Sequence, residues 1–143
     1  MAAAVAALLD ELGGTPPARA AIEAEARAHI EDPSLGIVLL AVPSPGEAGD
    51  DLLGVLTASW ARAIQVAGRL LTIEVLWTRR EWRDRGVGAG LVDALAAAAA
   101  AEGAGRVEVG LPRESFPALR ATERFYLANG FERLGPRMRR PVP

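Results

Sequence analysis

A glycine-rich turn with two arginines, Arg83-Asp84-Arg85-Gly86-Val87-Gly88, precedes an alanine-rich stretch. Alanine is the best intrinsic helix former, so the turn is expected to open a helix whose first backbone N–H groups have no partner and carry about half a positive charge. Glycine at three alternate positions (86, 88 and 90) would let a bulky anion reach these donors, because glycine has no Cβ. The guanidinium groups of Arg83 and Arg85 would add cationic donors beside the same point. The pattern predicts a phosphate-binding turn, against the alternative of an ordinary helix start with solvated arginines.

Two other phosphate-binding motifs fit this turn poorly. A P-loop needs a lysine followed by serine or threonine, and all 16 basic residues of the chain are arginine. The dinucleotide-binding fingerprint needs a third glycine, and Leu91 occupies that position. Neither a P-loop nor a dinucleotide-binding unit is therefore expected.

The helices and strands that must position this turn are predicted from the hydrophobic periodicity and from the Gly and Pro residues that mark their ends. Helices and strands alternate after a first pair of helices, which predicts a single mixed α/β (α+β) domain over residues 1–143. Thr15 is expected to cap the second helix. Residues 43–51 have turn chemistry and are read as a hairpin loop, and residues 60–69 as a connection. Helices are expected over residues 2–12, 16–30, 91–101 and 115–129, and strands over residues 36–42, 52–59, 70–78, 106–111 and 131–134.

The composition excludes several classes of protein. A net charge of −2 gives no general attraction for nucleic acid or for an acidic membrane. The chain has no Cys and a single His, His29, so no zinc site is expected, and His29 is read as a surface residue on a helix. Residues 2–9 lack the basic start of a signal peptide, and no stretch approaches the roughly 20 apolar residues of a membrane span. We expect a cytoplasmic protein.

Two motifs together resemble the GNAT superfamily of acetyl-CoA-dependent N-acetyltransferases. Its signature, Gln/Arg-x-x-Gly-x-Gly/Ala after a central strand, is matched by Arg83, Gly86 and Gly88. A second feature is an aromatic-Tyr pair near a helix end with Gly-Phe a few residues on, and Phe125-Tyr126-Leu127-Ala128-Asn129-Gly130-Phe131 matches it. The resemblance covers roughly residues 35–134, and residues 2–13 look like the family's first helix.

The resemblance implies a mixed, mostly antiparallel central sheet that splays at the cofactor site, with helices on both faces. Pantetheine would lie in the gap like an added strand, a mode in which main-chain hydrogen bonds give the affinity. The implied cosubstrate is acetyl-CoA, and no metal is implied. The strand residues that would bind the pantetheine are Leu76, Trp77 and Thr78, and the backbone N–H groups that would take the pyrophosphate belong to Arg83, Asp84, Arg85, Gly86, Val87, Gly88 and Ala89.

Two residues are candidates for proton transfer. The resemblance assigns the only tyrosine, Tyr126, as general acid toward the leaving sulfur, because a phenol stays protonated at neutral pH. The alternative is that the Tyr126 ring packs and its hydroxyl meets water. Glu74 interrupts an apolar strand, where an unpaired carboxylate is costly, and it is the candidate base. Its alternative role is an ordinary cross-strand ion pair with Arg62 or Arg69.

The sequence departs from the family in two places. Members usually have a short strand before the first helix, and this chain starts almost in that helix, so the sheet would have an exposed edge that a second copy could cover. Many members also carry an Asn at the position of Leu119, so one polar contact to the cofactor is expected to be missing. Trp60 and Arg62 could border the acceptor pocket or simply pack.

The leading functional hypothesis is an N-acetyltransferase that moves an acetyl group from acetyl-CoA to a primary amine by direct attack. The acceptor could be a small amine, an amino acid, an antibiotic or a peptide terminus. One alternative is a non-catalytic acyl-CoA sensor or interaction module that keeps the cofactor cradle. Another is a nucleotide-binding regulatory domain. Neither nucleic acid nor a membrane is expected as a partner.

Overall fold

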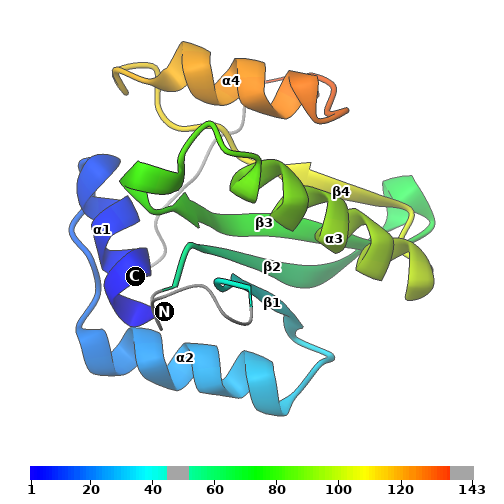
Figure 1. Cartoon of the computed structure of the whole chain (residues 1–143). Coiled ribbons are helices and arrows are strands. Elements are labelled where there is room, and N and C mark those ends of the chain that lie inside the picture. Colours follow the sequence, from blue (N-terminus) through cyan, green and yellow to red (C-terminus); the bar gives the residue numbers. More distant parts are fainter. Residues whose placement is uncertain (45–51, 136–143) are drawn as a thin grey trace, which may run out of the picture.

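The computed structural model describes residues 1–44 and 52–135. Four strands form one sheet, and helices lie on both of its faces (Figure 1). The expected hairpin loop at residues 43–51 falls largely outside the described residues. The elements in chain order are α1 (Ala2–Glu11), α2 (Arg19–Glu31), β1 (Gly36–Ala41), β2 (Gly54–Ala63), η1 (Ile64–Val66), β3 (Gly68–Thr78), η2 (Arg80–Trp82), α3 (Val87–Ala101), β4 (Arg106–Val109) and α4 (Leu119–Ala128).

The strands follow the order β1-β2-β3-β4. β1 pairs antiparallel with β2, and β2 pairs antiparallel with β3, whereas β4 runs parallel to β3 after the crossover through α3. The predicted mixed, mostly antiparallel sheet is therefore confirmed. In the described part of the chain β1 has no neighbour on its outer side, which leaves the exposed edge that the sequence suggested.

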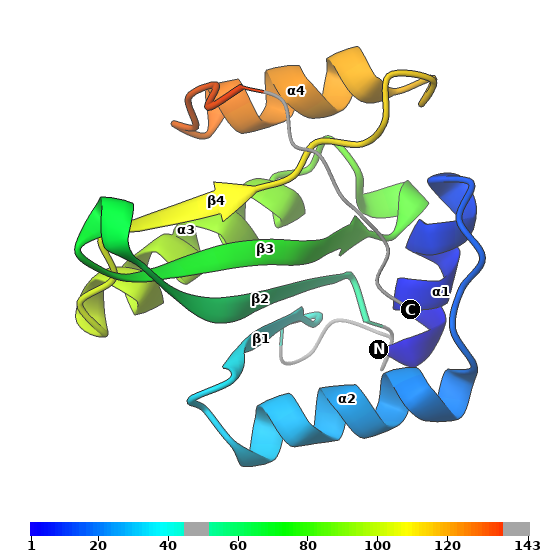
Figure 2. The same cartoon turned by 180° about the vertical axis from the view of Figure 1, so that it is seen from behind.

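Alternation along β2 shows how the two faces of the sheet are covered. Leu56 and Ala58 pack in the main core beneath α3, which contacts all four strands. Val55, on the opposite face, is fully buried although it lies outside that core. Ser59 shares this second face and lies 3.4 Å from His29 of α2. The second face is thus covered by α1 and α2. Figure 2, the view opposite to Figure 1, looks onto this second face, with α3 behind the sheet.

A β-bulge changes the direction of the side chains within β3. Ala58 pairs with Ile73 and Thr57 pairs with Val75, so Glu74 is an extra residue with no partner in β2. Ile73 before the bulge and Leu76 after it both pack toward the core beneath α3. Side chains therefore do not alternate regularly along residues 70–78, because an inserted residue reverses the phase of a strand.

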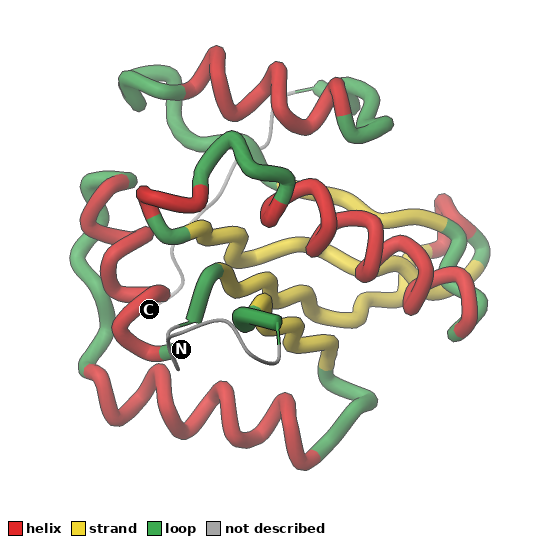
Figure 3. The backbone as a smooth tube through the Cα atoms, viewed as in Figure 1, coloured by secondary structure: helices red, strands yellow, loops and turns green. Residues whose placement is uncertain are grey.

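The bulge lies where the sheet splays. Strand β4 pairs with β3 from Leu70↔Arg106 to Ile73↔Val109 and ends there, whereas β3 continues to Thr78. Residues 75–78 keep their antiparallel partner β2 on one side only. The tube drawing in Figure 3 shows β3 extending past the end of β4. This confirms the expected splayed sheet of the fold class.

Several boundaries differ from the sequence expectations. The second helix is capped by Ala18, not Thr15, because residues 16 and 17 are prolines and the chain enters the helix only after them. Residues 60–63 and 68–69 belong to the strands, so the expected connection at residues 60–69 shrinks to η1 and Ala67, whose φ is +51°. Residues 131–134 form no strand. Within the described residues, no helix has the length and apolarity needed to cross a membrane.

The position of the main core predicts that two substitutions by alanine, one at Leu95 and one at Ile64, change the free energy of unfolding very differently. Leu95 of α3 is fully buried, whereas Ile64 in η1 is 98% exposed. We expect Leu95→Ala to lower the free energy of unfolding by about 2–5 kcal/mol through a cavity and lost burial. Ile64→Ala should change it by less than about 0.5 kcal/mol. Urea denaturation of both variants measures the difference, and equal losses would contradict this assignment of the core.

Candidate active site

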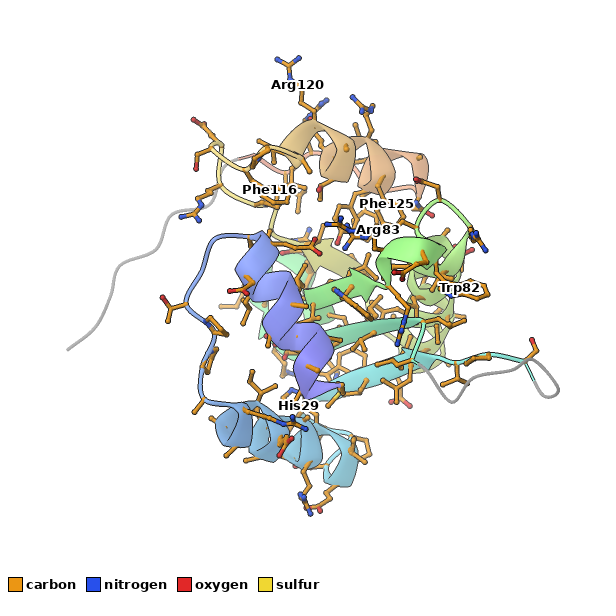
Figure 4. The ribbon with its side chains drawn as sticks, turned by 60° about the vertical axis from the view of Figure 1, so that its left-hand side comes forward. His29, Trp82, Arg83, Phe116, Arg120 and Phe125 are labelled. Atoms are coloured by element: carbon orange, nitrogen blue, oxygen red, sulfur yellow. The ribbon has the colours of Figure 1, made fainter. Side chains whose placement is uncertain are left out.

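A cavity of about 510 Å³ opens where β3 and β4 separate. It connects the two faces of the sheet, because its lining includes Leu8 of α1 from one layer and Gly88 of α3 from the other. Arg83, Phe116 and Phe125 lie near one another in the space between α1 and α4 (Figure 4). The cavity brings together most of the residues singled out from the sequence: Glu74, Leu76, Trp77, Thr78, Arg83, Asp84, Gly86, Gly88, Ala89 and Tyr126.

The turn before α3 presents free backbone donors to this cavity. Gly90 is the first amide of the helix to be bonded, to the carbonyl of Gly86 at 2.8 Å. Within the described chain, the amides of Val87, Gly88 and Ala89 therefore have no carbonyl one turn back, and the helix dipole favours an anion there. Gly86 caps the helix with φ +83°, a left-handed conformation that glycine adopts without strain.

The three glycines of this segment differ in what they require. A Cβ on Gly88 would lie 3.3 Å from the Phe125 ring, so the helix start and α4 approach closely at this point. Gly86 needs glycine for its backbone conformation, although space around it is open. A Cβ on Gly90 would meet nothing within 4 Å, and its amide is already bonded within the helix. Gly90 thus offers no free amide to an anion, and its part in an anion site stays limited to the open space that a missing Cβ leaves.

Arg83 is held by the protein itself. Its Nη2 donates to both carboxylate oxygens of Glu11, at 2.8 and 3.1 Å, and its Nε donates to the carbonyl of Thr78 at 3.1 Å. Its amide donates to the carbonyl of Arg80 at 3.2 Å. The Arg83 amide, expected to bind pyrophosphate, is therefore bonded within the protein, and two of the three guanidinium nitrogens are too, although Arg83 does line the cavity. Arg83 thereby joins the end of α1 to the end of β3.

Two other residues of the turn lie outside the cavity lining. The Arg85 guanidinium lies 5.3 Å from the centre of the Trp82 ring on the surface, and the Val87 side chain packs against the core. Asp84 adopts φ +61°, which a short polar side chain tolerates better than most. For Val87 this arrangement leaves the backbone as the group that can contact a ligand, whereas Asp84 lines the cavity.

Tyr126 lies in an aromatic cluster at the cavity. Its ring is 8% exposed and makes edge-to-face contacts with Phe125 and Phe131, at centroid distances of 5.2 and 5.1 Å. Burial disfavours the phenolate and raises the pKa of Tyr126 from 10.0 to about 12. The phenol is therefore protonated throughout the neutral and mildly alkaline range.

Glu74 stands alone at the bulge. Within the described residues it forms no ion pair or hydrogen bond, and it lines the cavity at the point where β4 ends. The alternative ion pair with Arg62 or Arg69 is wrong: Arg69 stacks on Trp60 at 3.8 Å and lies opposite Arg62 in the ladder. Trp60 and Arg62 are at the far end of β2 and do not border this cavity.

Comparison with known proteins identifies the family. The profile described as the acetyltransferase (GNAT) family matches residues 5–131. The chain belongs to the GNAT acetyltransferase family. No curated protein gives a significant match to the chain.

Solved structures share the GNAT fold of this chain at low sequence identity. An integron cassette protein from the mobile metagenome of Cole Harbour Salt Marsh is 18% identical, with a TM-score of 0.77 over 99% of this chain and 81% of that one. A probable acetyltransferase is 15% identical, with a TM-score of 0.76 over 99% and 88%. An aminoglycoside acetyltransferase from an uncultured soil metagenomic sample is 19% identical, with a TM-score of 0.75 over 100% and 90%. At such identities the likeness establishes the fold.

Sequence reasoning missed the residues that hold α1 over the GNAT site. Arg113, in the connection between β4 and α4, donates through Nη2 to the carbonyls of Leu12 and Gly13, both at 2.7 Å. Glu11 and Phe116 were missed as well, and both line the cavity. These contacts join segments about 70 to 100 residues apart in the sequence, so no local sequence pattern predicts them.

His29 also differs from its expected surface position. Its side chain is only 13% exposed and packs between α2 and the sheet, with Nδ1 at 3.0 Å from the Glu25 carbonyl and Nε2 at 3.4 Å from Ser59 Oγ. A Cβ on Gly36 would clash first with the carbonyl of Ala58 and then with the His29 ring, which explains the glycine there. No group of three or more candidate metal ligands occurs among residues 1–44 and 52–135.

The turn before α3 predicts opposite effects of two matched substitutions. Gly86→Ala should lower the free energy of unfolding by about 1–2 kcal/mol, because alanine is strained at positive φ. Gly90→Ala should raise it by about 0.5–1 kcal/mol, because alanine is the better helix former and the space is open. Urea denaturation measures both. A destabilised Gly90→Ala protein would contradict the arrangement of this turn.

The burial of Tyr126 predicts a loss of stability at alkaline pH. The pKa of Tyr126 is higher in the folded protein than in the unfolded chain, so the unfolded chain loses its phenol proton first as the pH rises. The free energy of unfolding is therefore unaffected by Tyr126 well below pH 10 and falls as the pH rises from about 10 toward about 12. Between pH 9 and pH 11 the free energy of unfolding should fall by about 1 kcal/mol more in the parent than in Tyr126→Phe. Because Tyr126 is the only tyrosine, tyrosinate absorbance reports its titration directly. A midpoint near pH 10 would contradict the buried environment.

Proposed function

We propose that this GNAT protein transfers the acetyl group of acetyl-CoA to a primary amine by direct attack of the amine on the thioester. The observation that carries the proposal is a single cavity that contains a free strand edge, the open N-terminus of α3, an unpaired carboxylate and a buried phenol. These are the groups that this reaction needs to bind the acyl donor and to move two protons.

The residues present fit acetyl-CoA. Residues 74–78 of β3 offer backbone groups on the side that β4 leaves uncovered, where a pantetheine chain can pair like an added strand. The amides of Val87, Gly88 and Ala89 are suited to the pyrophosphate. Gly88 permits the close approach of α4, and the exposed Arg85 lies beside the turn. When bound, acetyl-CoA supplies the activated acetyl group.

Glu74 is the residue that we propose as the base that deprotonates the acceptor amine. An alkyl ammonium has a pKa near 10.4, so at neutral pH most of the acceptor is protonated and cannot attack. The Glu74 carboxylate can attract this ammonium into the cavity and accept its proton, directly or through water. Backbone N–H groups of β3 beside it can stabilise negative charge that develops on the thioester oxygen.

Tyr126 is suited to assist departure of the sulfur. As the new C–N bond forms and the C–S bond breaks, the phenol can donate a hydrogen bond to the leaving thiolate. The raised pKa of Tyr126 keeps the proton available on the phenol. Because a thiol has a pKa near 8.5, below that of Tyr126, donation of a hydrogen bond is favoured over complete transfer.

The proposal is tested first by calorimetry with acetyl-CoA and then by release of CoA thiol with a panel of amines. We expect saturable binding that is lost when Gly86 and Gly88 are both replaced by valine and kept in Gly90→Ala. The chain contains no cysteine, so a thiol reagent reports only CoA. Binding of acetyl-CoA without turnover of any amine would favour the alternative of an acyl-CoA sensor. Binding of ATP without CoA would favour a nucleotide-binding domain.

A single substitution tests the part played by Glu74. We expect Glu74→Gln to lower kcat/KM for the amine by about 100-fold while acetyl-CoA affinity stays unchanged. The loss should be largest at low pH and smaller as the pH approaches about 10, where the amine loses its proton unaided. Glu132→Gln, an exposed carboxylate outside the cavity, is the matched control. An unchanged pH profile in Glu74→Gln would remove Glu74 from the mechanism.

A further inference from the structure

The cavity has two chemically different halves. On the α3 side it is lined by the turn before α3 and by the aromatic residues of α4. On the α1 side it is lined by Leu8, Leu12, Trp77, Pro112 and Phe116 together with Glu11 and Glu74. The α3 side holds the groups that fit acetyl-CoA, which leaves the α1 side for the acceptor. This assignment rests on the proposed function.

Most charged side chains of the acceptor half are paired with other groups of the protein. Among the described residues that line the cavity, the charged ones are Glu11, Glu74, Arg83 and Asp84. Arg83 Nη2 donates two hydrogen bonds to the Glu11 carboxylate, so these two opposite charges balance each other, and Arg83 Nε donates to the carbonyl of Thr78. Asp84 lies at the other end, in the turn before α3. One unpaired carboxylate, that of Glu74, therefore faces the acceptor.

This arrangement disfavours acceptors that carry a negative charge. A carboxylate or phosphate on the acceptor would need a cation to replace its water, and Arg83, the one arginine among the described lining residues, already has its charge balanced by Glu11. A second ammonium group would likewise find no second free carboxylate among the described residues of this half. Burying an unpaired charge against Leu8, Leu12 and Phe116 would be costly.

The apolar wall is also held in place before any ligand binds. Arg83 ties Glu11 to the end of β3, and Arg113 ties the carbonyls of Leu12 and Gly13 to the connection that carries Pro112 and Phe116. The two sides of the wall are thus fastened to each other across the opening. A wall that is already ordered does not have to lose conformational entropy on binding, which favours a compact apolar ligand group.

We infer that the acceptor is a primary amine with one positive charge, carried on an apolar alkyl or arylalkyl group. Glu74 would bind the ammonium at the bulge, and Leu8, Leu12, Pro112 and Phe116 would enclose the apolar group. The inference separates this chain from acetyltransferases that act on polycationic or anionic amines, because those acceptors need further charged residues that the described lining lacks.

Three amines of matched length test this inference. Pentylamine carries one ammonium, cadaverine adds a second ammonium at the far end, and norleucine adds a carboxylate beside the amine. With acetyl-CoA and the unmodified protein, we expect kcat/KM for pentylamine to exceed both of the others by at least about tenfold. Along a series of n-alkylamines, kcat/KM should rise about fourfold per methylene, the ratio that corresponds to about 0.8 kcal/mol for one buried CH₂.

Substitutions in the wall locate the effect. Phe116→Ala should flatten the dependence on alkyl length, and Leu111→Ala, in the same connection but outside this cavity, should keep it. Acetyl-CoA calorimetry shows that each variant is folded, and Leu12→Ala serves in place of a Phe116 variant that does not fold. Preference for cadaverine or norleucine, or indifference to chain length, would overturn the inference and leave the proposed function standing. Binding of acetyl-CoA with no turnover of any amine would overturn both.

Discussion

The site depends on the uncovered edge of β3. Backbone N–H and C=O groups that are withdrawn from water need hydrogen-bond partners, and β4 supplies them only as far as Ile73. Beyond that point the edge is open to whatever enters the cavity. The extra residue at Glu74 coincides with the end of the pairing, and it turns Leu76 and Thr78 toward α3 while Trp77 faces α1. The inserted residue thus lies where the free edge begins, and it sets which side chains of that edge face each side of the sheet.

Holding a splayed sheet open requires contacts that cross the gap. Arg83 and Arg113 provide them by fastening the end of α1 to β3 on one side and to the connection after β4 on the other. The Arg83 and Glu11 side chains are each about 40% exposed, so their ion pair contributes at most about 1 kcal/mol to stability. Its importance lies in geometry: the two hydrogen bonds to one carboxylate set the orientation of α1, and with it the width of the acceptor half.

The parts of this site that could be predicted from the sequence are those encoded by adjacent residues. The turn before α3 and the position of Tyr126 depend on spacing within a few residues, and the motifs led directly to the GNAT family. The bulge at Glu74 could not be predicted, because strand phase is set by the register with β2 and not by β3 alone. The ion pair between Arg83 and Glu11 could not be predicted either, because no local sequence pattern distinguishes a paired arginine from a free one.

The two halves of the cavity also explain how the fold persists at 15–19% identity to solved structures. The half that we propose for acetyl-CoA consists mainly of backbone groups, so it constrains few side chains beyond a glycine at Gly88 and a positive φ at Gly86. The acceptor half consists of side chains from α1 and from the connection after β4. Under the proposed function, substitutions there would change which amine is enclosed and would leave the strand edge and the helix N-terminus in place. Acceptor specificity can therefore diverge while the geometry of acyl-donor binding stays the same, and the acceptor must be inferred from the residues of each chain.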